Sequence, residues 1–170
     1  MTQAVLKHSV SELENRSGID RKSRETLADR LRLALSNAYQ LMINTQIVHW
    51  NAQGPLFFSV HKLTESQYEN LFGTIDDLAE RIRALGMPAP RTVGALFSTD
   101  LMKDFEESAN LETYLERLIA ANDRLATELR ETIKVAEKAD DVKTADLLTD
   151  FIGTLEEAAW MYRATLGDQS

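Results

Sequence analysis

The sequence predicts an all-α protein built as a four-helix bundle, and three observations favour this fold class. Its 170 residues include only 7 Gly and 3 Pro, which cluster at a few positions and leave long segments free to form helices. Within those segments, apolar residues recur at spacings of three and four, which is typical of core-facing helices. The first and last links between segments are short, whereas the middle link is long enough to carry the chain back along the bundle.

The first two helices are expected over residues 27–51 and 59–85, joined by a short turn. The first ends before Gly54-Pro55, and its apolar stripe is formed by Leu27, Leu31, Ala34, Leu35, Ala38, Leu41, Met42, Thr45, Val48 and His49. The second ends at Gly86, because Pro88 and Pro90 block any continuation, and its stripe is formed by Leu63, Leu71, Ile75, Leu78 and Ile82.

A second pair of helices follows a long connection that holds one short helix around residues 93–97. Asn110 is the predicted N-cap of the third long helix, which breaks at Asp140-Asp141. The fourth runs to Leu166, with Gly167 just beyond its end. This topology is the one-crossover, ferritin-like form of the four-helix bundle. The bundle is expected over residues 25–167, after a polar arm over residues 1–24 and before a short tail over residues 168–170.

Composition excludes several classes of function. The chain contains no cysteine, which excludes thiol chemistry, iron–sulfur clusters and cysteine zinc sites, so any metal must bind nitrogen or oxygen. Its net charge of −8 repels nucleic acid and anionic lipid and attracts small cations. No stretch approaches the roughly 20 apolar residues that span a bilayer, and the N-terminus has no apolar core region. A cytoplasmic protein without membrane partners is therefore expected.

The candidate chemical groups lie around the first hairpin. His49 ends the first helix and His61 opens the second, so the turn brings two imidazoles together, either as ligands or as core residues satisfied by carbonyls or water. The second helix also carries Glu65, Asp76 and Glu80, which share with His61 a stripe about 100° wide. Such a stripe is costly to bury on a helix rich in Leu and Ile unless it binds a ligand.

The spacing of these groups predicts a metal site shared between two chains. Glu65 and Asp76 lie about 16 Å apart along the helix axis, so they cannot bind one ion within a chain. If this helix packs antiparallel on its own copy about a two-fold axis, His61 and Glu65 of one chain face Asp76 and Glu80 of the other. With His49, the ligands are two histidines and carboxylates, a set that suits iron or zinc and favours iron where an oxidant has access.

Motifs of other reaction classes are absent from the sequence. The Glu-x-x-His pattern of intrachain di-iron bundles does not occur at any of the three histidines, His8, His49 and His61. The HExxH zinc motif, the P-loop and the GxSxG elbow are missing too. Hydrolysis and phosphoryl transfer therefore have no support.

The residues around the acidic stripe resemble those of the Dps proteins, the mini-ferritins of starved bacteria. The resemblance covers residues 27–166 and rests on His49-Trp50-Asn51, Gly54-Pro55, His61 twelve residues after His49, "DDLAERIRALG" around Asp76 and Glu80, and "WMYRA" from Trp160. It implies a dodecameric shell built from two-fold dimers, with ferroxidase sites formed by His49, His61, Glu65, Asp76 and Glu80. In that family ferrous ion is oxidised preferentially by hydrogen peroxide and the ferric product is stored in the cavity. Family members usually have Asp where this chain has Glu65, and the extra methylene would shift the first metal or make this residue ligate through water.

Two further features have alternative interpretations. Trp50 is either an apolar anchor for the hairpin or, as the resemblance implies, a one-electron donor near the iron. At the start of the fourth helix, Asp141 would cap the helix while Asp146 and Asp150 form a solvated face. The spacing of these three acids also resembles the acidic three-fold pores of Dps shells, through which cations would enter.

The sequence thus predicts an iron-storage and detoxification protein with ferroxidase activity, for which zinc is a possible competitor. The rival functions are a nucleoid-compacting, DNA-binding structural protein and a helical-bundle binding module without chemistry. DNA binding is expected to be weak or absent at neutral pH, because residues 1–25 hold five basic residues against four acidic ones and the C-terminal end adds no compensating charge.

Overall fold

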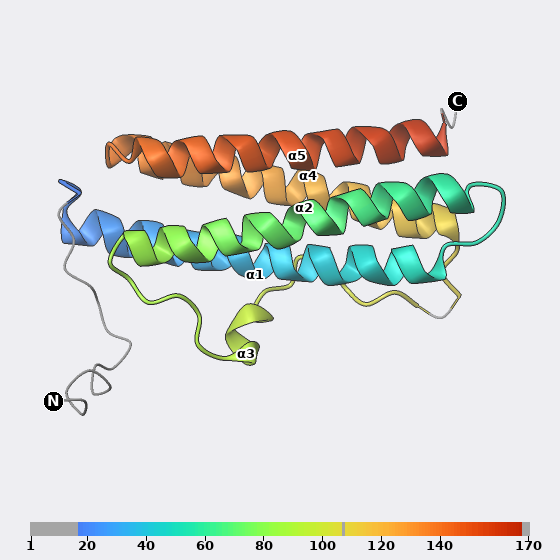
Figure 1. The fold of residues 1–170 in the computed structure, drawn as a ribbon, viewed down its shortest axis with the longest axis horizontal. Coiled ribbons are helices and arrows are strands. Elements are labelled where there is room, and N and C mark those ends of the chain that lie inside the picture. The colour runs from blue at the N-terminus through green and yellow to red at the C-terminus, as the bar shows by residue number, and fades with distance from the viewer. Residues whose placement is uncertain (1–16, 107, 168–170) are drawn as a thin grey trace, which may run out of the picture.

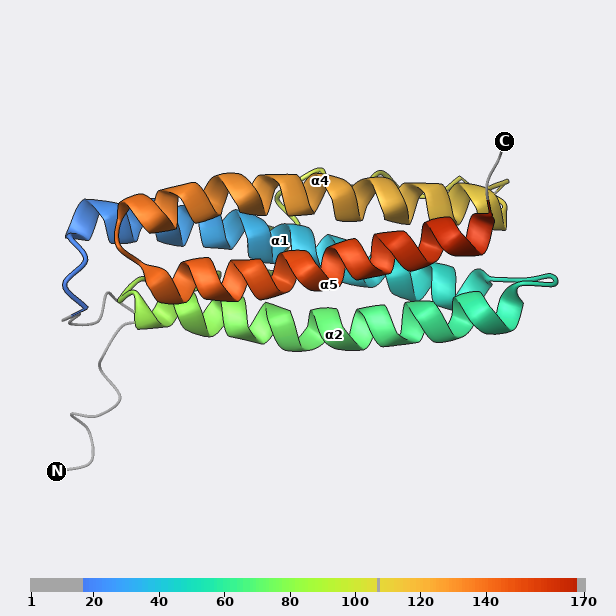
Figure 2. The ribbon, with the colours of Figure 1, turned by 90° about the horizontal axis from the view of Figure 1, so that it is seen from above.

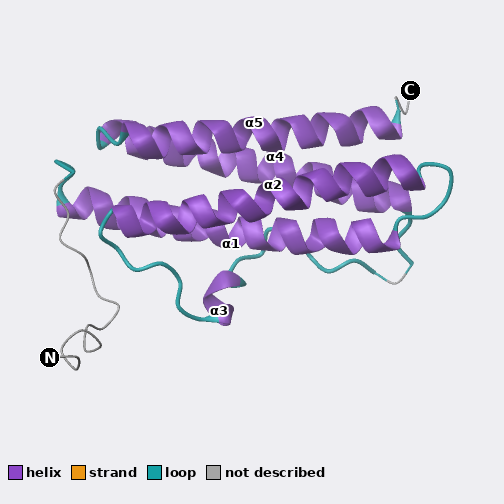
Figure 3. Ribbon diagram, in the orientation of Figure 1, coloured by secondary structure: helices purple, strands orange, loops and turns teal. Residues whose placement is uncertain are grey.

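The computed structural model describes residues 17–106 and 108–167, which are all-helical apart from their connections (Figures 1 and 3). The long helices form two antiparallel pairs, α1 (Arg21–Asn51) with α2 (Phe57–Ala84) and α4 (Leu111–Lys138) with α5 (Val142–Leu166). The short helix α3 (Val93–Leu96) lies in the long connection, as predicted. None of the helices in these ranges is long and apolar enough to cross a membrane.

The four long helices close a ring around one apolar core. α1 contacts α2, α2 contacts α5, α5 contacts α4 and α4 contacts α1 (Figure 2). The connection from α2 to α4 runs along the outside of α1, which α3 contacts, and joins opposite ends of the bundle (Figure 1). The predicted ferritin-like bundle with one long crossover is therefore confirmed.

The first helix begins six residues before the expected start at Leu27. Asp20 is its N-cap, and the Asp20 carboxylate accepts a hydrogen bond from the Ser23 amide (3.1 Å). The first turns are largely exposed and carry no apolar stripe, so periodicity does not reveal them. Residues 21–24, assigned to the polar arm from the sequence, belong to α1, and residues 1–16 of that arm lie outside the described residues.

Residues with positive φ follow α2 and α4. Gly86 follows α2 with φ of +84°, and this conformation lets the Met87 amide donate to the Ile82 carbonyl (3.2 Å). Asp140 has φ of +56° after α4, and the Asp141 amide donates to the Ala136 carbonyl (2.9 Å). Both breaks lie at the predicted positions.

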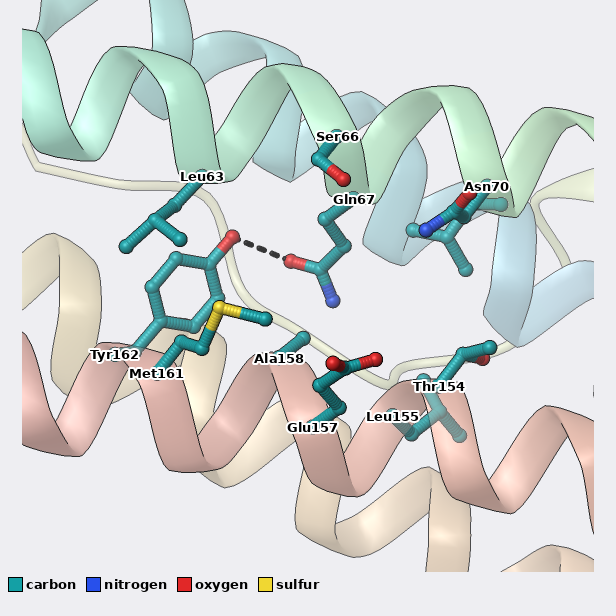
Figure 4. Close-up of a pocket in the computed structure, with 11 residues that line it drawn as sticks. Leu63, Ser66, Gln67, Asn70, Thr154, Leu155, Glu157, Ala158, Met161 and Tyr162 are labelled. Atoms are coloured by element: carbon teal, nitrogen blue, oxygen red, sulfur yellow. Dashed lines mark hydrogen bonds between the residues drawn. The ribbon is translucent and has the colours of Figure 1, made fainter.

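A buried polar cluster takes one side chain from each long helix. The Tyr162 hydroxyl donates to Gln67 Oε1 (2.6 Å; Figure 4). Gln67 Nε2 donates to Asn122 Oδ1 (2.7 Å), and Thr45 Oγ1 lies 3.4 Å from Gln67 Oε1. Burial raises the pKa of Tyr162, so its hydroxyl remains a donor. The cluster borders a pocket of about 150 Å³ between α2 and α5. Because each partner is needed to satisfy another, the cluster fixes the alignment of the four helices.

Candidate metal centre

The two histidines meet beside the turn that joins α1 to α2. His49, in the last turn of α1, and His61, in the first turns of α2, stack with ring centroids 3.7 Å apart and planes inclined by 19°. His49 Nδ1 donates to the His61 carbonyl (2.9 Å), and His61 Nδ1 donates to the His49 carbonyl (3.2 Å). A carbonyl can only accept, so both protons lie on Nδ1 in the neutral rings. Each ring therefore keeps Nε2 available to bind a metal.

Neighbouring side chains hold the two rings in place. Thr64 Oγ1 lies 3.2 Å from His49 Nδ1, and the Tyr68 ring meets His49 edge-on with centroids 5.3 Å apart. Phe57 packs on His61 with centroids 5.1 Å apart. These three residues were not predicted from the sequence, although Thr64 and Tyr68 lie three and seven positions after His61, on the same side of the helix.

Glu65 lies one helical turn beyond His61 and already has a cationic partner. Lys62 Nζ lies 2.5 Å from Glu65 Oε2, and this hydrogen bond, opposed in part by burial, lowers the pKa of Glu65. The carboxylate is therefore ionised and suited to a cation. Lys62 must move aside before Glu65 can use both oxygens for a metal, a competition that the sequence did not predict.

Asp76 and Glu80 are exposed further along α2, about 16 Å and about 22 Å beyond Glu65 along the axis. Within the described residues of one chain, no three His, Asp or Glu side chains come together as a metal site. Asp76 lies at the edge of an apolar cavity of about 340 Å³ formed by α1, α2 and the crossover. Beside it, Phe72 is 71% exposed. The candidate ligands of one chain thus fall into two separated groups, and the group at Asp76 lies next to an uncovered apolar surface.

Trp50 does not anchor the hairpin within this chain. Its side chain is 67% exposed, and that of Phe58 in the same turn region is 71% exposed. Two large, mostly exposed aromatic groups therefore flank the histidine pair. Exposing such large apolar side chains to water is unfavourable for a monomer, and it is typical of a surface that contacts a partner.

The three acids at the start of α5 differ in their surroundings. Asp141 is 2% exposed and is the N-cap of α5, accepting from the Thr144 amide (2.9 Å) and from Arg81 Nη2 (2.6 Å). Burial raises the pKa of Asp141, but the hydrogen bonds from Arg81 and Thr144 outweigh burial and hold it below its ordinary value. Asp146 and Asp150 are exposed. Helix capping explains the position of Asp141. Of these three acids, Asp146 and Asp150 are the ones whose carboxylates face solvent.

Known proteins are similar to this chain in sequence and in fold. The chain matches the family model of the ferritin-like domain over residues 28–170. It is 33% identical over 150 residues to the DNA protection during starvation protein of Mycolicibacterium smegmatis, covering 88% of this chain and 81% of that protein.

Two solved structures are similar along nearly the whole chain. An archaeal Dps homologue from Halobacterium salinarum has a TM-score of 0.86 and 26% identity, covering 100% of this chain and 96% of that chain. The Dps protein of Vibrio cholerae O1 has a TM-score of 0.79 and 28% identity, covering 91% and 100% respectively. With its one-crossover bundle and its histidine hairpin, the chain belongs to the Dps family of ferritin-like proteins.

Proposed function

We propose that this protein oxidises ferrous iron at sites shared between two chains and stores the ferric product inside a shell of twelve subunits. The observation that carries the proposal is the stacked His49–His61 pair, whose Nε2 atoms are left available by reciprocal Nδ1–carbonyl hydrogen bonds. The similar Vibrio cholerae protein is described as a member of a broad superfamily of ferritin-like diiron-carboxylate proteins. Iron storage and protection is the function that this membership favours.

A two-fold contact of α2 with its copy would complete the site. In an antiparallel pair centred between residues 70 and 71, His61 faces Glu80 of the other chain and Glu65 faces Asp76. The same contact would cover Phe72 close to the axis. One symmetric interface thus accounts for both the separated half-sites and the uncovered aromatic surface.

The chemistry then follows from the ligand set. The two Nε2 atoms and the carboxylates hold ferrous ions as substrate, and the negative charge of the carboxylates stabilises the ferric product. Two ferrous ions supply the two electrons that reduce one hydrogen peroxide to two waters, with two protons taken up. Where only one ferrous ion is bound, the Trp50 indole would supply the second electron and lose a proton. Zinc fits the same ligands and would compete with iron.

The direct test is oxidation of ferrous iron by hydrogen peroxide, followed by the rise in ferric absorbance. We expect Asp76→Ala to lower the rate at least about tenfold, because it removes a ligand from each site. Asp77→Ala is the matched control, since the neighbouring carboxylate points about 100° around the helix and should leave the rate unchanged. Equal rates for both variants and the native protein would contradict the proposal.

Asp146 and Asp150 are the proposed lining of the pore for iron uptake. Replacing both with Asn should slow uptake into intact shells several-fold at low ionic strength, and the deficit should shrink as salt screens the field. Asp29→Asn with Asp123→Asn removes the same two charges from α1 and α4 and serves as the control. Uptake that is equally fast in both double variants would leave Asp146 and Asp150 as solvated surface residues.

DNA compaction is the alternative function, because the Mycolicibacterium smegmatis relative is named for DNA protection. We expect weak or no binding, since the chain has a net charge of −8 and its first 25 residues are nearly neutral. A gel-shift assay with supercoiled plasmid at near-physiological salt, without magnesium, checks this. Plasmid retained in the well at micromolar protein would favour the DNA-binding function instead.

A further inference from the structure

A basic trough with a volume of about 370 Å³ lies between the crossover and α4. It is remote from α2, because α4 lies diagonally across the bundle from that helix. Among the described residues that line the trough, three are cationic, Lys103, Arg117 and Arg124, and none is acidic. Three cations around one hollow are unexpected in a chain with a net charge of −8.

Backbone carbonyls of the crossover fix both guanidinium groups. Arg117 Nη1 donates to the Asp104 carbonyl (2.9 Å), and its guanidinium lies over the Phe105 ring, 5.5 Å from the centroid. Arg124 Nη1 donates to the Asp100 carbonyl (2.8 Å). A carbonyl orients a guanidinium without neutralising its charge, so these contacts pre-organise the cations for another anion.

The two arginines differ in how much charge they offer. Arg124 Nε also donates to Glu128 Oε1 (3.1 Å), so a carboxylate offsets part of its charge. Arg117 makes no ion pair within 4.0 Å among the described residues, and Lys103 makes none either. Arg117 and Lys103 therefore provide the stronger attraction for an anion.

Small apolar residues form the floor of the trough. Arg117 and Arg124 lie two helical turns apart on α4, about 10 Å along the axis, and Ala120 and Ala121 leave space between them. Leu101, from the crossover, is 6% exposed and adds apolar surface. The hollow thus combines a cationic rim with an apolar base, as sites for small organic anions do.

We propose that the trough binds a small organic phosphate monoester of the size of a nucleoside monophosphate. The phosphate would be held by the planar guanidinium of Arg117 and the ammonium group of Lys103. Together these two cations suit a tetrahedral dianion better than they suit a singly charged carboxylate. The organic part would rest on Ala120 and Ala121. The volume is sufficient for such a ligand, whereas a hollow of this size on an acidic chain does not suit a nucleic-acid duplex. This proposal does not depend on iron oxidation.

The test is isothermal titration of the full-length assembled protein with AMP, inorganic phosphate and adenosine. We expect saturable binding of AMP, weaker binding of phosphate and none of adenosine. Arg117→Gln and Lys103→Gln should each weaken AMP at least tenfold, because each removes a charge-assisted contact with the phosphate. Ala120→Leu keeps every charge but fills the floor, so it should weaken AMP and spare inorganic phosphate.

The control is Arg130→Gln, which removes one positive charge from the same helix at an exposed site paired with Glu156. It should leave AMP affinity unchanged. Lys103 is exposed on the crossover, so its variant tests the site even if Arg117→Gln disturbs the loop. Equal affinity for AMP in the native protein and Lys103→Gln would overturn the proposal. Two other results would also overturn it: Arg130→Gln weakening AMP binding as much as Lys103→Gln does, or adenosine binding as tightly as AMP.

Discussion

A mixed dimer of His61→Ala and Asp76→Ala chains is expected to keep one working iron site, whereas each variant alone keeps none. In the proposed two-fold contact, each site takes His61 from one chain and Asp76 from the other. The mixed dimer therefore places both substitutions in one site and leaves the other intact. Recovery of activity by two inactive chains is the largest effect that the proposed assembly predicts.

Co-expression with two different affinity tags would isolate the mixed species for the ferrous iron and peroxide assay. Random pairing of equal amounts should restore roughly one quarter of the native sites, and the purified mixed dimer one half. His49→Ala mixed with His61→Ala is the matched control, because both substitutions lie in the same half-site and no pairing leaves an intact site. A mixed dimer as inactive as its parents, or full activity in either parent, would refute the shared site.

Replacing Arg81 with Ala is expected to destabilise the fold by about 3 kcal/mol, because the buried Asp141 carboxylate would lose its ion-pair partner. Arg81 also donates through Nε to Thr144 Oγ1 (2.8 Å), so one side chain ties the end of α2 to the first turn of α5. Urea denaturation at fixed protein concentration measures the loss. Arg130→Ala, which breaks an exposed ion pair, should cost at most about 1 kcal/mol.

Acid should reduce the difference between the native protein and Arg81→Ala. Asp141 has a native pKa below its ordinary value of 3.8, so its contribution to stability is complete above that value and is lost as the pH falls through the lowered one. Below both values the carboxyl is protonated and Arg81 no longer stabilises it. A difference that stays constant from pH 7 to pH 2 would show that the ion pair is not its source.

Much of the fold could be predicted because its signals are local. Helix ends are marked in the sequence by one or two residues each, namely Gly86, Asn110 and Asp140-Asp141. The apolar stripes reveal four helices. The start of α1 was misjudged because its first turns depend on the Asp20 cap and pack little apolar surface. Periodicity detects burial, and a helix that extends beyond the core gives no such signal.

The candidate site was harder to predict, because side-chain partners depend on distances between helices. The sequence brings His49 and His61 together across a short turn, but the hydrogen bond from each Nδ1 to the other residue's carbonyl depends on their stacked geometry. The partner of Asp141 is Arg81, sixty residues earlier, and no spacing rule links the two. Residues that share a helix or flank a short turn could be grouped from sequence, whereas contacts between residues far apart in the chain could not.

Because α2 carries both half-sites, it also sets how far apart two iron centres lie in the proposed dimer. The histidine end and the acidic end of the helix are separated by about 22 Å. This exceeds the distance of about 8 Å over which charges act in physiological salt. Loading one centre should therefore leave the affinity of the other unchanged, and the dimer would take up iron as two independent binding reactions.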